Sequence, residues 1–290
     1  MFQAARRRLI LPFLLPQIIL YTGVTFTSIV ATVVLSLTSW AGVNPPRFVG
    51  LQNFRTILKD LNFRNTIGNS AYYTISGGVL LLVFATLLAL CLNKPFRGRR
   101  VYRFLILAPA VLSVSVAALM WKWIYNPLFG LAGSPLRSVG KALDLEPLLE
   151  GVLRNPSTTL TAVVFTNVWH TMGVWVLLLL AGLDRLPPSL LDAARVDGAN
   201  EWQVFFYVTL PLMWDLFRIV ILLWVMSALQ AFSYAYIMRS RGVMATYIYS
   251  VTFNQWSWAY GMSLATVVMA AVFVTIILAN RLLQREVAEF

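Results

Sequence analysis

Six long apolar runs, separated by polar segments, dominate the pattern of the chain. A helix needs about 20 mostly apolar residues to cross the roughly 30 Å hydrocarbon layer of a membrane. A single segment in lipid can satisfy its backbone hydrogen bonds only internally, so each run is predicted to be a helix. The predicted spans are residues 12–38, 67–92, 102–125, 160–183, 212–238 and 262–282. The pattern predicts an all-α integral membrane protein with one transmembrane domain over residues 1–290.

The composition agrees with lipid as the solvent of much of the chain. Hydrophobic residues make up 59% of the chain and charged residues 12%, whereas soluble chains carry about a quarter charged residues. A net charge of +12 would suggest nucleic acid in a soluble protein. Here, however, the basic residues cluster at the ends of spans, as cytoplasmic anchors do. The clusters are Arg6, Arg7 and Arg8, then Lys94, Arg97, Arg99, Arg100 and Arg103. We therefore expect membrane lipid, and no nucleic acid, as a partner.

The same clusters predict the orientation of the chain. Short loops rich in Lys and Arg stay in the cytoplasm, which places the N-terminus and the 94–103 linker inside. With six spans, the C-terminus, which carries Arg281 and Arg285, also lies inside. The first apolar run is too long for a cleaved signal peptide, so it is a retained span. We predict a multi-pass membrane protein with both termini inside the cell.

Residues for catalysis or metal binding are scarce. The single cysteine, Cys91, has no disulfide partner, and the lone histidine, His170, has no ligand residue nearby in sequence. The chain also lacks the glycine-rich loop that cradles phosphates, because Gly140-Lys141 has neither the spacing nor the hydroxyl that such a loop needs. We predict no catalytic residue, no metal and no cofactor bound by this chain.

Two polar segments on the outer side are longer than turns. Residues 42–64 and 126–157 contain several prolines that interrupt regular helix, which predicts short interfacial pieces over the membrane face. Two interpretations stay open: these pieces contact an external partner, or they merely connect spans.

The polar segment between the fourth and fifth spans has the pattern of two short helices. Ser189 followed by Asp192 predicts a capped start, and Asp197-Gly198 predicts a turn. Asn200 with Gln203 predicts a second N-cap, and Pro211 is expected to end the second helix. Periodicity alone leaves open a purely structural interfacial helix-turn-helix.

The residues of this segment resemble the EAA loop of binding-protein-dependent ABC importer permeases. In order, the matching elements are Asp192-Ala193-Ala194, Asp197-Gly198-Ala199, Phe206 and Leu210-Pro211. The resemblance implies a type I ABC importer permease fold with a cytoplasmic coupling loop over residues 184–211. It implies that the protein lies in the bacterial cytoplasmic (inner) membrane. It also implies that ATP and Mg are handled by a separate ATPase that this loop contacts. The residues implied in ATPase coupling are Leu191, Asp192, Ala193, Ala194, Asp197, Gly198, Ala199, Phe206 and Pro211.

Other segments resemble the sugar branch of that family, which includes the maltose and glycerol-phosphate permeases. They are Gly50-Leu51-Gln52-Asn53-Phe54, Trp121-Lys122-Trp123-Ile124-Tyr125 and Ala181-Gly182-Leu183. The family usually has Glu where this chain has Asp192, and residues 238–246 depart from its usual Gly-Gly-Pro-like stretch. The resemblance implies a second permease in a heterodimer, two ATPase subunits and an extracytoplasmic solute-binding protein, which together import a sugar or polyol by alternating access.

Polar and aromatic side chains within two spans are the candidates for a substrate path, because such groups are costly against lipid. Three lie on the fourth span, and on the fifth span Ser227, Gln230 and Tyr234 recur at a spacing that predicts one shared helix face. The candidates are Asn167, His170, Thr171, Ser227, Gln230, Ser233 and Tyr234. The competing interpretation is that they only form hydrogen bonds between helices.

Two alternative functions remain to be distinguished. An ion-coupled secondary transporter predicts acidic residues inside the spans, but Asp215 at the end of the fifth run is the nearest example. An ABC permease for another solute, such as glycerol phosphate, a phosphodiester or an amino acid, shares the coupling loop. Lys122, Arg239 and Arg241 lie near the predicted outer face and could attract a negative charge, so a phosphate-bearing solute stays an alternative.

Overall fold

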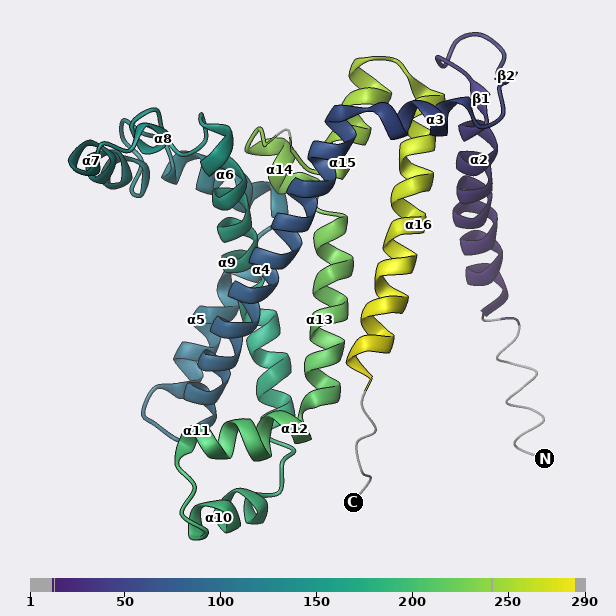
Figure 1. Cartoon of the computed structure of the whole chain (residues 1–290). Coiled ribbons are helices and arrows are strands. Elements are labelled where there is room, and N and C mark those ends of the chain that lie inside the picture. The colour runs from purple at the N-terminus through teal and green to yellow at the C-terminus, as the bar shows by residue number, and fades with distance from the viewer. Residues whose placement is uncertain (1–11, 13, 241, 285–290) are drawn as a thin grey trace, which may run out of the picture. The chain divides into compact units, whose positions relative to one another are not determined.

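The computed structural model describes residues 12, 14–240 and 242–284, most of which are helical (Figure 1). The chain forms two compact units. The first unit comprises Met1–Phe63 and Tyr247–Ala271, and the second comprises Arg64–Thr246 and Val272–Phe290. The terminal residues 1–11 and 285–290, with Arg6, Arg7, Arg8 and Arg285, lie outside the described residues.

Six spans are present among the described residues if one bent pair of helices is counted as a span. Five candidates are single spans, Leu14–Ser36, Leu61–Asn93, Thr158–Leu183, Trp214–Ile237 and Trp258–Leu283, and the bent pair is Arg99–Val111 with Val114–Ile124. The prediction of an all-α membrane protein with six spans is confirmed.

The third span differs from the predicted straight helix over residues 102–125. It consists of α5 (Arg99–Val111) and α6 (Val114–Ile124), which meet at an angle of 98°. Pro109 lies in the last turn of α5 and has no N–H to donate. Ser113 then starts α6 as an N-cap, because its side chain accepts a hydrogen bond from the Val116 N–H at 3.3 Å. Both signals are visible in the sequence, and together they break the span.

The fifth span is also interrupted, which corrects the prediction of one shared helix face. Helix α13 (Trp214–Leu229) ends before Gln230, and α14 (Ser233–Ile237) starts after Phe232. No glycine or proline marks the interruption. Instead, Tyr234 and Ala235 of α14 are buried, and α14 packs against α6 and α9 (Pro156–Leu183). Tertiary packing therefore interrupts the helix at a point where local sequence alone favours a continuous one.

The first unit contains the first span and short outer elements. The first span contains the π-helical turn η1 (Thr22–Phe26) and α2 (Thr27–Ser36). The outer elements include a two-stranded antiparallel hairpin, β1 (Thr38–Ser39) with β2 (Arg47–Phe48), and α3 (Gln52–Lys59). Its later elements are the last part of α15 (Met244–Tyr249), η3 (Ser250–Asn254) and the first part of α16 (Trp258–Leu283). The core of this unit is formed by Ile57, Phe63, Val251 and Leu264.

Asp60 is the polar anchor of the first unit. Its Oδ2 atom accepts hydrogen bonds from the hydroxyls of Tyr247 at 2.5 Å and Tyr260 at 2.6 Å. Its Oδ1 atom accepts from the backbone N–H groups of Asn62 and Phe63 at the start of α4 (Leu61–Asn93). Burial acts to raise the pKa of the Asp60 carboxyl, but these four hydrogen bonds outweigh burial and hold the pKa below its ordinary value of 3.8.

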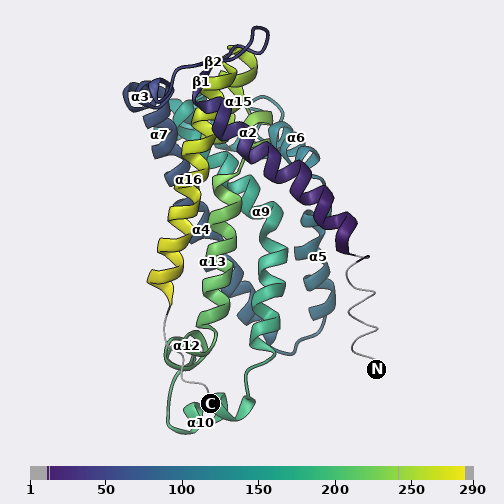
Figure 2. The same cartoon turned by 90° about the vertical axis from the view of Figure 1, so that its right-hand side faces the viewer.

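The second unit is built around α9. In Figure 2, α5, α9 and α13 lie side by side, and α4 contributes to the same core. Gly173 permits the close approach of α5 to α9, because an added Cβ would lie 2.3 Å from the carbonyl oxygen of Ile106. The outer helices α7 (Gly133–Leu143) and α8 (Glu146–Leu149) follow α6. They correspond to the short pieces predicted for residues 126–157.

Replacing Asp60 with Asn is expected to lower the free energy of unfolding by about 1.5–3 kcal/mol, the range for hydrogen bonds to a charged group. Because the folded pKa lies below 3.8, the carboxylate stabilises the fold fully above that value. The contribution is lost as the pH falls through the lower, folded pKa. Thermal unfolding in detergent should show a gap between wild type and Asp60→Asn that is constant from about pH 6 to pH 8. The gap should close below pH 3.8.

Tyr247→Phe is the matched control, because it keeps the carboxylate and removes one of its donors. It should destabilise less than Asp60→Asn and show the same loss at acid pH. A gap that persists unchanged at acid pH would mean that the charge of Asp60 is not what stabilises this unit.

Candidate coupling loop and substrate path

The coupling loop begins with α10 (Pro188–Val196), which is two residues longer at its start than the predicted cap at Ser189 implies. Pro187 is the N-cap, and Pro188 occupies the first helical position, where its missing N–H needs no partner. Ser189 lies inside the helix, so the prediction of a capping box from Ser189 and Asp192 is wrong. The proline pair supplies the helix start instead.

Gly198 makes the turn after α10, as predicted. Its φ angle is 86°, a left-handed conformation that disfavours other residues. The Ala199 N–H donates to the Ala194 carbonyl at 3.0 Å, which closes the end of α10. The predicted second cap is confirmed: the Gln203 N–H donates to Asn200 Oδ1 at 2.9 Å, and the Asn200 N–H donates to Gln203 Oε1 at 2.8 Å. The turn is therefore held at both sides by local hydrogen bonds.

The second helix of the loop is longer than predicted and does not end at Pro211. It runs through α11 (Glu201–Val204), the π-helical turn η2 (Phe205–Thr209) and α12 (Leu210–Leu212), and the interruption falls at Met213. A π turn widens the helix just before the proline ring, where an α turn would bring a carbonyl against the ring. Pro211 is thus accommodated inside the helix.

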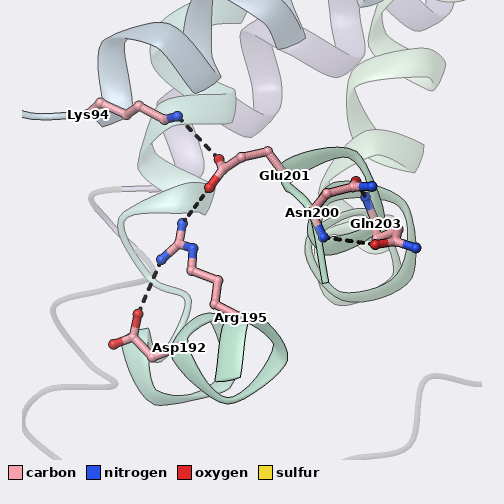
Figure 3. A network of polar contacts seen from close by, with 6 residues as sticks. All are labelled: Lys94, Asp192, Arg195, Asn200, Glu201 and Gln203. Atoms are coloured by element: carbon pink, nitrogen blue, oxygen red, sulfur yellow. Dashed lines mark hydrogen bonds and ion pairs between the residues drawn. The ribbon is translucent and has the colours of Figure 1, made fainter. Parts of the chain in front are cut away.

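A chain of ion pairs connects the two helices of the loop to the linker between α4 and α5 (Figure 3). Lys94 Nζ lies 3.2 Å from Glu201 Oε2, and Arg195 Nη2 lies 3.3 Å from Glu201 Oε1. Arg195 Nη1 also lies 3.1 Å from Asp192 Oδ1. The hydrogen bond from Lys94, with the charges of Lys94 and Arg195, lowers the pKa of the Glu201 carboxyl.

The linker and the loop thus lie at the same end of the second unit. A further pair, Arg99 with Asp184 at 3.8 Å, joins them. Helix α16 ends at this end too, because the Trp214 indole N–H donates to the Leu283 carbonyl at 2.7 Å. This arrangement agrees with the orientation predicted from the basic linker.

The coupling candidates form a mostly exposed surface. Leu191, Ala194 and Ala199 are half-buried, and the exposed members are Asp192, Ala193, Asp197, Gly198, Phe206 and Pro211. Large apolar side chains not singled out in the sequence lie among them. Val196 beside the turn is 88% exposed, and Trp202 stacks on Phe206 with ring centroids 6.3 Å apart. Exposed apolar groups gathered on a rigid loop are typical of a surface that contacts a partner.

The fourth-span candidates are hydrogen bonded within the chain: Asn167 and His170 are buried, and Thr171 is half-buried. Asn167 Nδ2 donates to the Tyr73 hydroxyl on α4 at 2.7 Å, and Thr171 Oγ1 donates to the Asn167 carbonyl. The two ring nitrogens of His170 contact the Tyr234 hydroxyl and the Leu112 carbonyl. Tyr73 and Leu112 were not predicted as partners, because neither position carries a sequence signal for contact with α9.

The fifth-span candidates divide into two groups. Tyr234 is buried against His170, and Ser233 is half-buried. Ser227 and Gln230 are exposed, and the Ser227 hydroxyl donates to the Trp224 carbonyl of its own helix. The structure therefore brings His170 and Tyr234 together and leaves Ser227 and Gln230 on an open face.

Spans with interrupted helices and a polar loop at the cytoplasmic end are features of a membrane transport subunit. Residues 82–288 match the family model of the binding-protein-dependent transport system inner membrane component, and the chain belongs to that family. It is a multi-pass permease of the ABC importer class in the inner membrane, as predicted.

The similarity to curated relatives extends along most of the chain. The sulfoquinovosyl glycerol transport system permease protein SmoG of Agrobacterium fabrum is 31% identical over 81% of this chain and 76% of its own length. The trehalose/maltose transport system permease protein MalF of Thermococcus litoralis is 31% identical over 78% of this chain and 76% of its own length. A chain of the bacterial alginate ABC transporter, solved with an alginate pentasaccharide-bound periplasmic protein, has a TM-score of 0.82 at 19% identity. The match covers 99% of this chain and 97% of the alginate transporter chain. The two chains therefore share the same fold.

Reversing the charge of Lys94 or of Glu201 is expected to lower uptake by the assembled transporter about two- to fivefold. Each reversal replaces attraction by repulsion at an exposed pair, where such interactions are worth roughly 0.2–1 kcal/mol. The double variant Lys94→Glu/Glu201→Lys restores opposite charges at positions 94 and 201 but leaves a like charge beside Arg195. It should therefore recover part of the uptake that each single reversal loses. The measurement is the initial rate of cargo uptake into vesicles at low salt, where screening is weakest.

Arg97→Glu is the control, since it reverses a charge in the same linker without a direct pair to the loop. Equal losses in Arg97→Glu and Lys94→Glu, or no recovery in the double variant, would show that general linker charge matters rather than this contact.

Proposed function

We propose that this chain is the transmembrane permease subunit of an ATP-driven importer for a carbohydrate, coupled to a separate ATPase through residues 189–211. ATP and Mg are then bound and used by that ATPase, and this chain performs no hydrolysis. The observation that carries the proposal is the exposed coupling loop. Hydrogen bonds and ion pairs within this chain hold its two helices, while the apolar side chains of Val196, Trp202 and Phe206 are exposed.

A loop of this kind is suited to transmit force. Local hydrogen bonds hold α10, Gly198 and α11 as one body, and Glu201 of that body pairs with Lys94 in the linker that leads to the third span. Asp184, between α9 and α10, pairs with Arg99 at the start of α5. Val196 and Phe206 offer apolar surface, and Asp192 offers charge, to a docking cleft on the ATPase. Closure of an ATPase dimer would move this body and switch the central cavity between outward and inward access.

The proposed cargo class rests on the relatives and on the chemistry of the path. Relatives are named for transport of sulfoquinovosyl glycerol, of trehalose and maltose, and of multiple sugars. Ser227 and Gln230 face away from the core of this chain and supply neutral donors and acceptors. Neutral hydroxyl and amide groups match the hydroxyls of a sugar without requiring a charge on the cargo.

The proposal includes the other members of the assembly. A second, homologous permease would cover the open faces of this chain and complete the cavity, and two ATPase subunits would dock at the two coupling loops. An extracytoplasmic binding protein would deliver the cargo. The solved alginate transporter with its periplasmic protein supports an assembly of this kind.

Replacing Gly198 with Val is expected to reduce uptake more than tenfold without loss of membrane insertion. A β-branched residue is strained at φ 86°, by roughly 1–2 kcal/mol, so the turn between α10 and α11 should be displaced. Gly198→Asn is the matched control, because Asn tolerates the left-handed conformation and should retain much of the activity. Space around Gly198 is open within this chain, so a clash does not confound the pair.

The measurement is ATP-dependent sugar uptake by vesicles containing the full assembly, with membrane insertion checked by protein yield. Normal uptake in Gly198→Val would remove the coupling role of the loop. Uptake by the purified chain without any ATPase would instead support the ion-coupled alternative.

A further inference from the structure

His170 joins the two interrupted spans of the second unit. Its Nε2 atom lies 3.1 Å from the Leu112 carbonyl oxygen, at the break between α5 and α6. Its Nδ1 atom lies 2.5 Å from the Tyr234 hydroxyl on α14, just after the break in the fifth span. His170 itself lies midway along α9, which is continuous. One imidazole therefore contacts both interruptions from an unbroken helix.

The partners determine the tautomer of the neutral ring. A carbonyl oxygen can only accept, so Nε2 carries the proton and donates it to Leu112. Nδ1 is then the acceptor, and Tyr234 donates its hydroxyl hydrogen to it. Both nitrogens of a neutral His170 are fully used, which leaves the ring no donor or acceptor for a cargo molecule.

The hydrogen bond from His170 pairs a backbone carbonyl that the bend leaves without a helical partner. Helix α5 ends at Val111, and Leu112 has an extended conformation, so its carbonyl oxygen has no partner in a following helical turn. An unpaired carbonyl at membrane depth is costly. The imidazole N–H supplies the missing donor, so the 98° bend depends on the position of His170.

The helices beyond the two breaks pack together. Helices α6 and α14 contact each other, and each contacts α9. His170 and Tyr234 are only 5% and 6% exposed, so the connection lies inside this packed group. Helix α6 leads directly to the outer segment of residues 126–157, so this packed group lies next to the outer helices of the second unit.

We propose that His170 and Tyr234 form a latch that holds α6 and α14 against α9 in the outward-closed state, and that the latch opens when the permease switches access. They are positioning residues and do not contact the cargo. The inference rests on the proposed transport function, and it assigns cargo contact to residues on the open face, such as Ser227 and Gln230.

The chain contains a matched control for this latch. Tyr73 on α4 also makes a buried tyrosine hydroxyl bond to α9, accepting from Asn167 at 2.7 Å. Both α4 and α9 are continuous helices, so this bond joins no interruption. Tyr73→Phe and Tyr234→Phe each remove one oxygen atom from a buried contact with α9, but only Tyr234→Phe weakens the latch.

The test uses the complete transporter in vesicles and compares wild type, Tyr234→Phe, His170→Phe, the double variant and Tyr73→Phe. The readouts are ATP hydrolysis without cargo-loaded binding protein, and the KM and maximal rate of uptake. Loss of a buried hydrogen bond shifts a two-state balance by about three- to tenfold. Tyr234→Phe and His170→Phe should therefore raise cargo-independent hydrolysis about three- to tenfold, with KM for cargo unchanged within about twofold.

The double variant should match His170→Phe, because Tyr234 has already lost its partner there, and Tyr73→Phe should behave like wild type. Several outcomes would overturn the latch: unchanged hydrolysis in both single variants, an equal rise in Tyr73→Phe, an additive double variant, or a raised KM with unchanged hydrolysis. The last outcome would identify a cargo contact. Absence of ATP-driven uptake in the wild-type assembly would contradict the proposed function instead, so the two failures are distinguishable.

Discussion

A break in a membrane-spanning helix leaves backbone groups that lipid cannot satisfy, and the arrangement of the second unit depends on how those groups are paired. The third span turns through 98° at Leu112 and Ser113. Ser113 pairs with the start of α6, and His170 pairs with the end of α5. The bend is thus stabilised by one local contact and one contact from a distant helix. Removing either leaves a backbone group without its partner.

The coupling loop lies outside the spans, and it is shaped by local contacts instead. Pro188 starts α10 where no donor is needed, Gly198 turns the chain, and Asn200 with Gln203 caps the next helix. These contacts involve residues within a few positions of each other, so the loop does not depend on the packing of the spans for its shape. Its ion pairs to Lys94 and Arg99 are exposed and individually weak. They orient a body that is already rigid.

This difference explains what could be predicted from the sequence. Apolar length identifies the spans, and the Gly198 turn and the Asn200 cap are local signals that the structure confirms. Pro109 and Ser113 also predict a break, but the length of the apolar run around them favours one straight span over residues 102–125. The interruption after Leu229 has no local signal, because burial of Tyr234 and Ala235 determines it. The contacts of Asn167 with Tyr73, and of His170 with Leu112, depend on which helices become neighbours. Spacing along one span cannot supply that information, and the coupling and cargo roles of the predicted residues stay predictions.

Helix α9 connects the two parts of the proposed mechanism. It is continuous over Pro156–Leu183, and Gly173 allows α5 to pack closely along it. Its cytoplasmic end passes directly into the coupling loop, and its middle carries His170. A movement of the loop would therefore reach the two breaks through one rigid helix. Because α6 and α14 follow those breaks, a small displacement of α9 is enough to alter both hydrogen bonds of His170 together. Cargo binding on the open face and ATPase docking at the loop would then act on the same pair of interruptions from opposite sides.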